Sequence, residues 1–125
     1  MTNVEYWINS SKDDLDTAEK LFESKKYHHS LFFVHLALEK ILKAIFVSIK
    51  KQPSPLIHDL VRLSEKVGIQ TRNEITLQLA EISTFNIAAR YDDYKLKFYK
   101  KATKEYAQKW LTIGKDLYGV FRQKI

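Results

Sequence analysis

Basic and aromatic side chains alternate in the last third of the chain, a composition that suits phosphate binding. Guanidinium and ammonium groups bind phosphate, and aromatic rings stack on nucleic-acid bases. The candidate binding residues are Arg90, Tyr91, Lys95, Lys97, Lys100 and Lys101. Phe98 and Tyr99 are interleaved with these lysines. The alternative interpretation is a solvated lysine face whose aromatic residues only pack the last helix onto a bundle.

The charge of the chain is concentrated in the same region. The net charge is +6, and residues 95–125 hold nine Lys and Arg against two acidic residues. Residues 1–94 hold twelve basic and thirteen acidic residues, so they are close to neutral. A basic cluster of this kind attracts phosphate-bearing partners.

His58 is a further candidate for phosphate binding, and it precedes Asp59 and Leu60 after a proline-rich loop. Folding could bring His58 next to Arg90, which would create a catalytic pair. In the alternative interpretation, Asp59 caps a short helix and His58 fixes the loop. The spacing alone leaves both possibilities open.

Other kinds of chemistry find little support. The chain has no cysteine, which excludes disulfides, thiolate catalysis and cysteine-based zinc sites. His28 and His29 are adjacent and should point apart on a helix, while His35 and Glu39 share a face but lack a third metal ligand. Three scattered glycines cannot form a phosphate-binding loop. We therefore expect neither a metal site nor a cofactor.

Four long helical segments and one short segment must position these residues. Apolar residues recur at three- and four-residue steps in segments 2–24, 27–50, 71–90 and 102–122. Capping-box spacing at Thr2/Glu5 and Thr71/Glu74 marks two helix starts. A short helix from about His58 ends at Gly68, and residues 90–94 break the pattern.

The segment 27–50 is apolar around most of its circumference. Between Leu31 and Leu38 only His35 is polar, and His35, Glu39 and Lys43 form one narrow polar line. Such a helix is central to its bundle, lies at an oligomer interface, or both. We expect a homodimer interface at Phe32, Phe33 and Leu36.

These segments predict an all-α fold: an up-and-down four-helix bundle with an additional short helix in a single domain, residues 1–125. No secretory signal is visible at the N-terminus, and charged residues interrupt the apolar stretch from Leu31 to Ile49, which argues against a membrane span. We therefore expect a cytoplasmic protein.

Four motifs in order resemble the HEPN domain (higher eukaryotes and prokaryotes nucleotide-binding). The most specific of them is the run from Phe32 to Ala44, which is similar to an aromatic start followed by Ala-x-Glu-Lys-x-Leu-Lys-Ala. The other three are Asp14-Leu15-x-x-Ala18, His58-Asp59-Leu60 with Leu63, and Ala89-Arg90-Tyr91. Asp92 stands where relatives often have proline.

The resemblance implies a helical bundle that usually dimerises. It also implies a minimal nucleotidyltransferase as partner, often in a toxin–antitoxin pair, and in many members ribonuclease activity from an Arg-x4–6-His motif. Here no histidine follows any arginine, because the last histidine is His58 and the first arginine is Arg62. We therefore expect no catalytic residues: a non-catalytic module that binds nucleotide or RNA. The alternative is a ribonuclease toxin with a non-standard active site.

Overall fold

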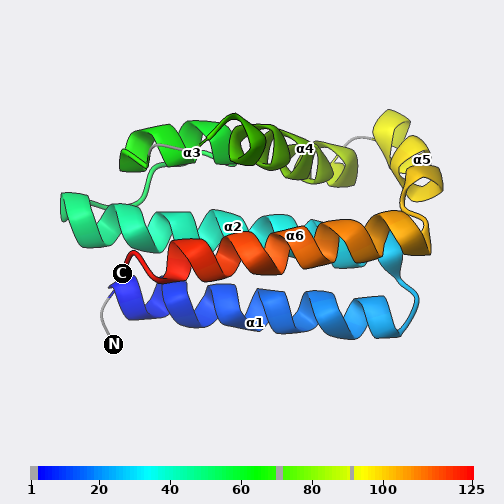
Figure 1. Ribbon diagram of the computed structural model, residues 1–125, viewed down its shortest axis with the longest axis horizontal. Coiled ribbons are helices and arrows are strands. Elements are labelled where there is room, and N and C mark those ends of the chain that lie inside the picture. The colour runs from blue at the N-terminus through cyan, green and yellow to red at the C-terminus, as the bar shows by residue number, and fades with distance from the viewer. Residues whose placement is uncertain (1–2, 70–71, 91) are drawn as a thin grey trace.

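The computed structural model describes residues 3–69, 72–90 and 92–125, apart from the side chains of Ala89, Arg90, Asp92 and Asp93. The described residues form the helices α1 (Asn3–Glu23), α2 (Tyr27–Lys50), α3 (Leu60–Val67), α4 (Asn73–Arg90), α5 (Asp92–Lys101) and α6 (Lys104–Arg122). Figure 1 shows α1, α2 and α6 lying side by side, with α3 and α4 along the opposite side of α2 and α5 at one end. The all-α bundle expected from the sequence is confirmed.

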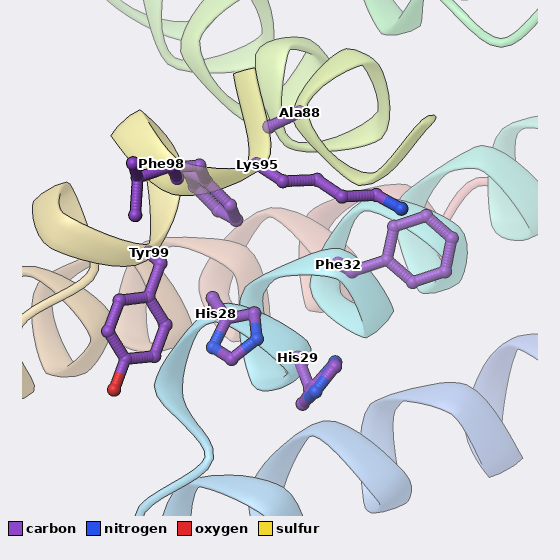
Figure 2. Close-up of a pocket in the computed structure, with 8 residues that line it drawn as sticks. His28, His29, Phe32, Ala88, Lys95, Phe98 and Tyr99 are labelled. Carbon is purple, nitrogen blue, oxygen red and sulfur yellow. The ribbon is translucent and has the colours of Figure 1, made fainter. Parts of the chain in front are cut away.

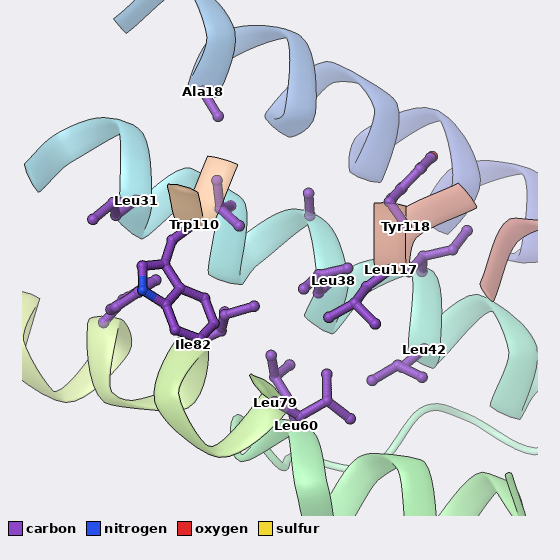
Figure 3. Packing of buried hydrophobic residues seen from close by; sticks show 14 of the residues in the cluster. Ala18, Leu31, Leu38, Leu42, Leu60, Leu79, Ile82, Trp110, Leu117 and Tyr118 are labelled. Carbon is purple, nitrogen blue, oxygen red and sulfur yellow. The ribbon is translucent and has the colours of Figure 1, made fainter. Parts of the chain in front are cut away.

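Helix α2 is the central helix, since it contacts each of the other five. Its buried apolar residues face several neighbours, and residues such as Leu38, Leu42 and Ile45 are fully buried. Figure 3 shows Leu38 and Leu42 in one cluster with Leu117 and Tyr118 of α6 and with Leu79 and Ile82 of α4. The apolar circumference of α2 is therefore covered largely within one chain.

Local signals set several helix ends as the sequence predicts. The Asp59 carboxylate accepts hydrogen bonds from the backbone amides of Val61 and Arg62 and so caps α3. Gly68 closes α3 in the left-handed conformation, with φ of 84°. The predicted capping boxes at Thr2 and Thr71 lie outside the described residues.

One expectation about the helices was wrong. Residues 92–101 form α5, although the sequence suggested a break followed by a helix from about residue 102. Only Phe98 of α5 is buried among its described side chains, so no apolar stripe marks the helix. On α1, the Asp14 side chain is only 7% exposed, and its carboxylate pairs with Lys40 Nζ at 2.8 Å.

Among the described residues, no helix is long and apolar enough to cross a membrane.

Candidate functional site

The tight turn between α1 and α2 places two lysines beside the first turn of α2. The Lys26 amide donates to the Leu21 carbonyl and the Lys25 amide to the Phe22 carbonyl, both at 2.9 Å. This is the hydrogen-bond pattern of a Schellman motif, which requires a left-handed residue after the helix. Lys25 is that residue, with φ of 63°, in a conformation that favours glycine. The backbone therefore fixes where both lysine side chains begin.

A cavity of about 520 Å³ opens between the start of α2 and helix α5. Its walls are mostly apolar and aromatic, and three basic residues also line it. The lining residues are His28, His29, Phe32, Ala88, Lys95, Leu96, Phe98 and Tyr99. Figure 2 shows Lys95 extending across this cavity towards Phe32, with the two imidazoles between Phe32 and Tyr99.

A second cavity of about 570 Å³ adjoins the first and shares His28, His29 and Tyr99 with it. This one is more basic. Besides the shared residues it is lined by Lys25, Lys26, Tyr27, Lys100, Ala102 and Thr103. We call the two cavities together the basic groove. Its lysines come from the α1–α2 turn and from α5, two segments far apart in the sequence.

Helix α5 divides the predicted lysine run between two surfaces. Lys95 and Lys100 line the basic groove, whereas Lys97 and Lys101 line a third cavity of about 320 Å³ between α5 and α4. Lys101 Nζ also binds Glu81 Oε2 at 2.8 Å and lies 5.2 Å from the centre of the Tyr106 ring. Lys101 therefore helps to join α5 to α4 and α6, which limits its availability to a ligand.

The remaining predicted binding residues lie away from the groove or outside the described part of the chain. Tyr91 and the side chain of Arg90 are outside the described residues. His58 lines none of these three cavities. Of the predicted interface residues, Phe33 and Leu36 are half-buried on α2, and Phe32 forms part of the groove wall.

The sequence interpretation missed four residues of the groove: Lys25, Lys26, His28 and His29. The histidines were expected to point apart, but their ring centroids are 4.0 Å apart. The edge of the Tyr99 ring packs on His28, with centroids 5.1 Å apart and planes at 72°. Four basic residues within the pentapeptide Lys25–His29 were the available signal.

A separate polar cluster lies inside the bundle, on the polar line of α2. Glu39 is 5% exposed, and its carboxylate accepts hydrogen bonds from Lys43 Nζ at 2.9 Å and from His58 Nδ1 at 3.1 Å. Burial by itself would raise the pKa of Glu39. The hydrogen bond and positive charge of Lys43, with His35 and His58, outweigh burial and lower that pKa below its usual value.

This cluster ties the proline-rich loop to α2. His35 Nε2 donates a hydrogen bond to the carbonyl oxygen of His58 at 2.8 Å, and the His58 ring binds Glu39. The Leu60 amide, a little further along the chain, donates to Ser83 Oγ at 2.9 Å. These contacts favour the interpretation in which His58 fixes the loop. Among the described residues, no group of three or more His, Asp or Glu could hold a metal ion.

Comparisons with known proteins agree with this architecture. The family profile of the HEPN domain matches residues 4–124. Among solved structures, TT1696 from Thermus thermophilus has the same fold with a TM-score of 0.85, covering 100% of both chains at 15% sequence identity. No curated protein matches the chain in sequence. Since the profile spans essentially the whole chain, the protein belongs to the HEPN domain family.

Proposed function

We propose that this protein is a non-catalytic HEPN module that binds RNA or nucleotide phosphate in the basic groove. The observation that carries the proposal is the convergence of Lys25 and Lys26 with Lys95 and Lys100 around one aromatic-walled groove. Ammonium groups neutralise phosphates, while exposed rings such as Tyr99 offer a surface for stacked bases. No carboxylate is among the described lining residues of the two cavities, so an anion meets no repulsion from their walls.

Binding of this kind depends strongly on salt. For a single strand, log affinity falls with log salt by about 0.7 for each phosphate contact. Three or four lysine contacts predict a loss of about twentyfold to fiftyfold between 50 and 200 mM salt. Fluorescence anisotropy with a labelled uridine oligonucleotide measures this slope.

Two lysines of matched backbone geometry allow a controlled test. Lys25 lines the groove and Lys51 follows α2, and both are left-handed, with φ of 63° and 55°. Glycine removes the charge at either position and favours the existing backbone, so neither substitution should destabilise the fold. We expect Lys25→Gly to weaken RNA binding and to reduce the salt slope by about 0.7. Lys51→Gly should bind like the wild type.

Equal losses of RNA affinity in Lys25→Gly and Lys51→Gly would show that only the total charge of the protein matters. That result would contradict a binding site in the groove. The oligonucleotide should also be recovered intact. Cleavage that His58→Ala abolishes would instead support a ribonuclease toxin with a non-standard active site. One observation favours that alternative: Glu39 orients the half-exposed His58 ring, as a carboxylate orients a general base.

The proposal extends to assembly. We infer that the protein acts in the cytoplasm as a homodimer and associates with a minimal nucleotidyltransferase, in the manner of a toxin–antitoxin pair. The support for this is family membership together with the half-buried apolar residues Phe33 and Leu36 on α2. Co-purification with the product of a neighbouring nucleotidyltransferase gene would test the partner directly.

A further inference from the structure

Two imidazoles stand at the border of the two cavities that make up the basic groove. His28 and His29 line both cavities, and their ring centroids are 4.0 Å apart with planes inclined at 38°. Neighbouring residues on a helix are separated by about 100° around its axis. The two side chains must therefore turn towards each other, and any ligand that spans both cavities passes them.

The groups facing this pair are basic or neutral. The titratable and charged residues that line the groove besides the two histidines are Lys25, Lys26, Tyr27, Lys95, Tyr99 and Lys100. Helix α4 and the start of α6 contribute Ala88 and Thr103, which do not titrate. A protonated imidazole here has like charges around it and no carboxylate among the described lining residues. Burial first, and then the neighbouring His29, accordingly lower the pKa of His28.

We propose that a phosphate-bearing ligand enters the basic groove together with a proton, which the His28–His29 pair takes up. This inference rests on the proposed function, because it concerns how the same groove is regulated. The phosphate supplies a counter-charge that none of the described lining residues offers, and an imidazolium donates a hydrogen bond to it. Binding and protonation therefore favour each other by the same factor. Because the two rings are in contact, a second proton would meet strong repulsion, so one proton is taken up.

The sign of the effect follows from this linkage. The pKa of His28 is lowered in the empty groove, and a bound phosphate raises it, so affinity rises as pH falls between those two values. One fully coupled proton changes the dissociation constant by up to about tenfold for each pH unit. RNA binding would then respond to modest acidification.

The probe is a uridine decanucleotide with a hydroxyl group at both ends. Its internal phosphodiesters keep one charge each over this range, whereas a terminal phosphate would titrate near about pH 6 and obscure the result. Dissociation constants are measured from about pH 8 to about pH 5.5 at constant ionic strength, on either side of the ordinary histidine pKa. Calorimetry in two buffers of different ionisation enthalpy counts the protons taken up. We expect tighter binding at low pH and an uptake of up to one proton.

Variants separate the pair from other titrating groups. Phenylalanine keeps an aromatic ring but cannot titrate, so His28→Phe with His29→Phe should bind with the same affinity at both ends of the pH range. His58→Gln changes a histidine outside the groove and should keep the pH dependence of the wild type. Thermal melting at each pH confirms that every variant is folded.

The outcomes distinguish the two proposals. RNA binding that depends on salt but not on pH would overturn the proton uptake and leave the proposed function standing. Retention of the pH dependence in the double phenylalanine variant, or its loss in His58→Gln, would also overturn the uptake. Absence of RNA binding at either pH, even at low salt, would overturn both.

Discussion

Three polar side chains of the mostly apolar helix α2, His35, Glu39 and Lys43, are buried in the bundle, where the half-exposed His58 also binds Glu39. Lys43 and Glu39 are each 5% exposed and form a short ion pair, and the Lys43 ammonium lies 5.5 Å from the centre of the Trp7 ring. A buried charge is tolerated only when it is paired and hydrogen-bonded. Each member of the cluster therefore depends on the others, and removing one partner should cost more than losing an ordinary hydrogen bond.

Glu39→Gln tests this dependence. The amide keeps the shape of the side chain but leaves the Lys43 ammonium buried without its counter-charge, so we expect the free energy of unfolding to fall by about 3 kcal/mol. Urea denaturation at neutral pH measures the loss. The matched control is Asp16→Asn, which breaks the exposed pair with Lys20. That change should cost less than about 1 kcal/mol.

The same carboxylate predicts a pH dependence of stability. The pKa of Glu39 is lowered in the folded protein, so its contribution is present above the unfolded pKa and is lost as pH falls through the folded pKa. The wild type should lose this stability in the acid range below about pH 4.5. Glu39→Gln should give a flatter curve there. Parallel curves for the two proteins would mean that the cluster does not hold Glu39 ionised.

At the scale of elements, the approach of α6 to α2 depends on a glycine. A Cβ atom at Gly114 would overlap Cγ1 of Val34, a fully buried residue of α2. Valine in a helix has little freedom to rotate away, so the helices would have to separate. Gly119 lies on the same helix, but a Cβ there would meet no atom within 4 Å.

The two glycines give opposite predictions for the same substitution. Gly114→Ala should lower the free energy of unfolding by about 1–3 kcal/mol through overpacking. Gly119→Ala should raise it by about 0.5–1 kcal/mol, because alanine is the better helix former. Chemical denaturation of both variants measures the difference. A stabilised Gly114→Ala would show that α2 and α6 are more loosely packed than described.

Helix α5 differs from the closely packed helices α2 and α6. It has one buried anchor and several basic groups. Phe98 packs against Phe85 of α4 with ring centroids 5.3 Å apart, and the remaining described side chains of α5 are exposed. Together with the Lys101–Glu81 ion pair, this anchor holds α5 where Lys95 and Lys100 lie near Lys25 and Lys26. The basic groove therefore depends on where α5 packs as well as on the lysines that α5 carries.

For the molecule as a whole, the apolar circumference of α2 is no longer the reason for expecting a dimer. The apolar surface of α2 is explained by its central position, so it does not by itself require a second chain. The half-buried residues Phe33 and Leu36 remain as the proposed interface on α2. Other large apolar residues are more exposed, including Leu77 on α4 at 71%.

The mass measured by light scattering tests the proposed homodimer, and interface variants test where the second copy binds. We expect a mass near twice the 14.7 kDa of the chain at micromolar concentration. Leu36→Glu should shift the mass to that of the monomer, because a carboxylate at the interface would be desolvated without a partner. Leu77→Glu should have no effect. The reverse result would move the interface to α4, and a monomeric wild type would contradict the dimer.

Features that depend on neighbouring residues could be predicted from the sequence. The bounds of α2, the Asp59 cap and the Gly68 terminus all follow from periodicity and capping, which operate over a few residues. Family membership also follows from the sequence, because each of its motifs is a short run of neighbouring residues. The lysine-rich segment that forms α5 was also recognised from the sequence, because its basic residues are close neighbours along the chain.

Which of those residues meet depends on how the helices pack. The tertiary structure places Lys25 and Lys26 near Lys95 and Lys100, pairs Lys101 with Glu81, and ties the half-exposed His58 to the buried Glu39. It also revealed α5, whose single buried Phe98 gives no periodic signal. The physical reason is that contacts between helices depend on how whole elements pack, and no local pattern records which distant element supplies the other side of a groove.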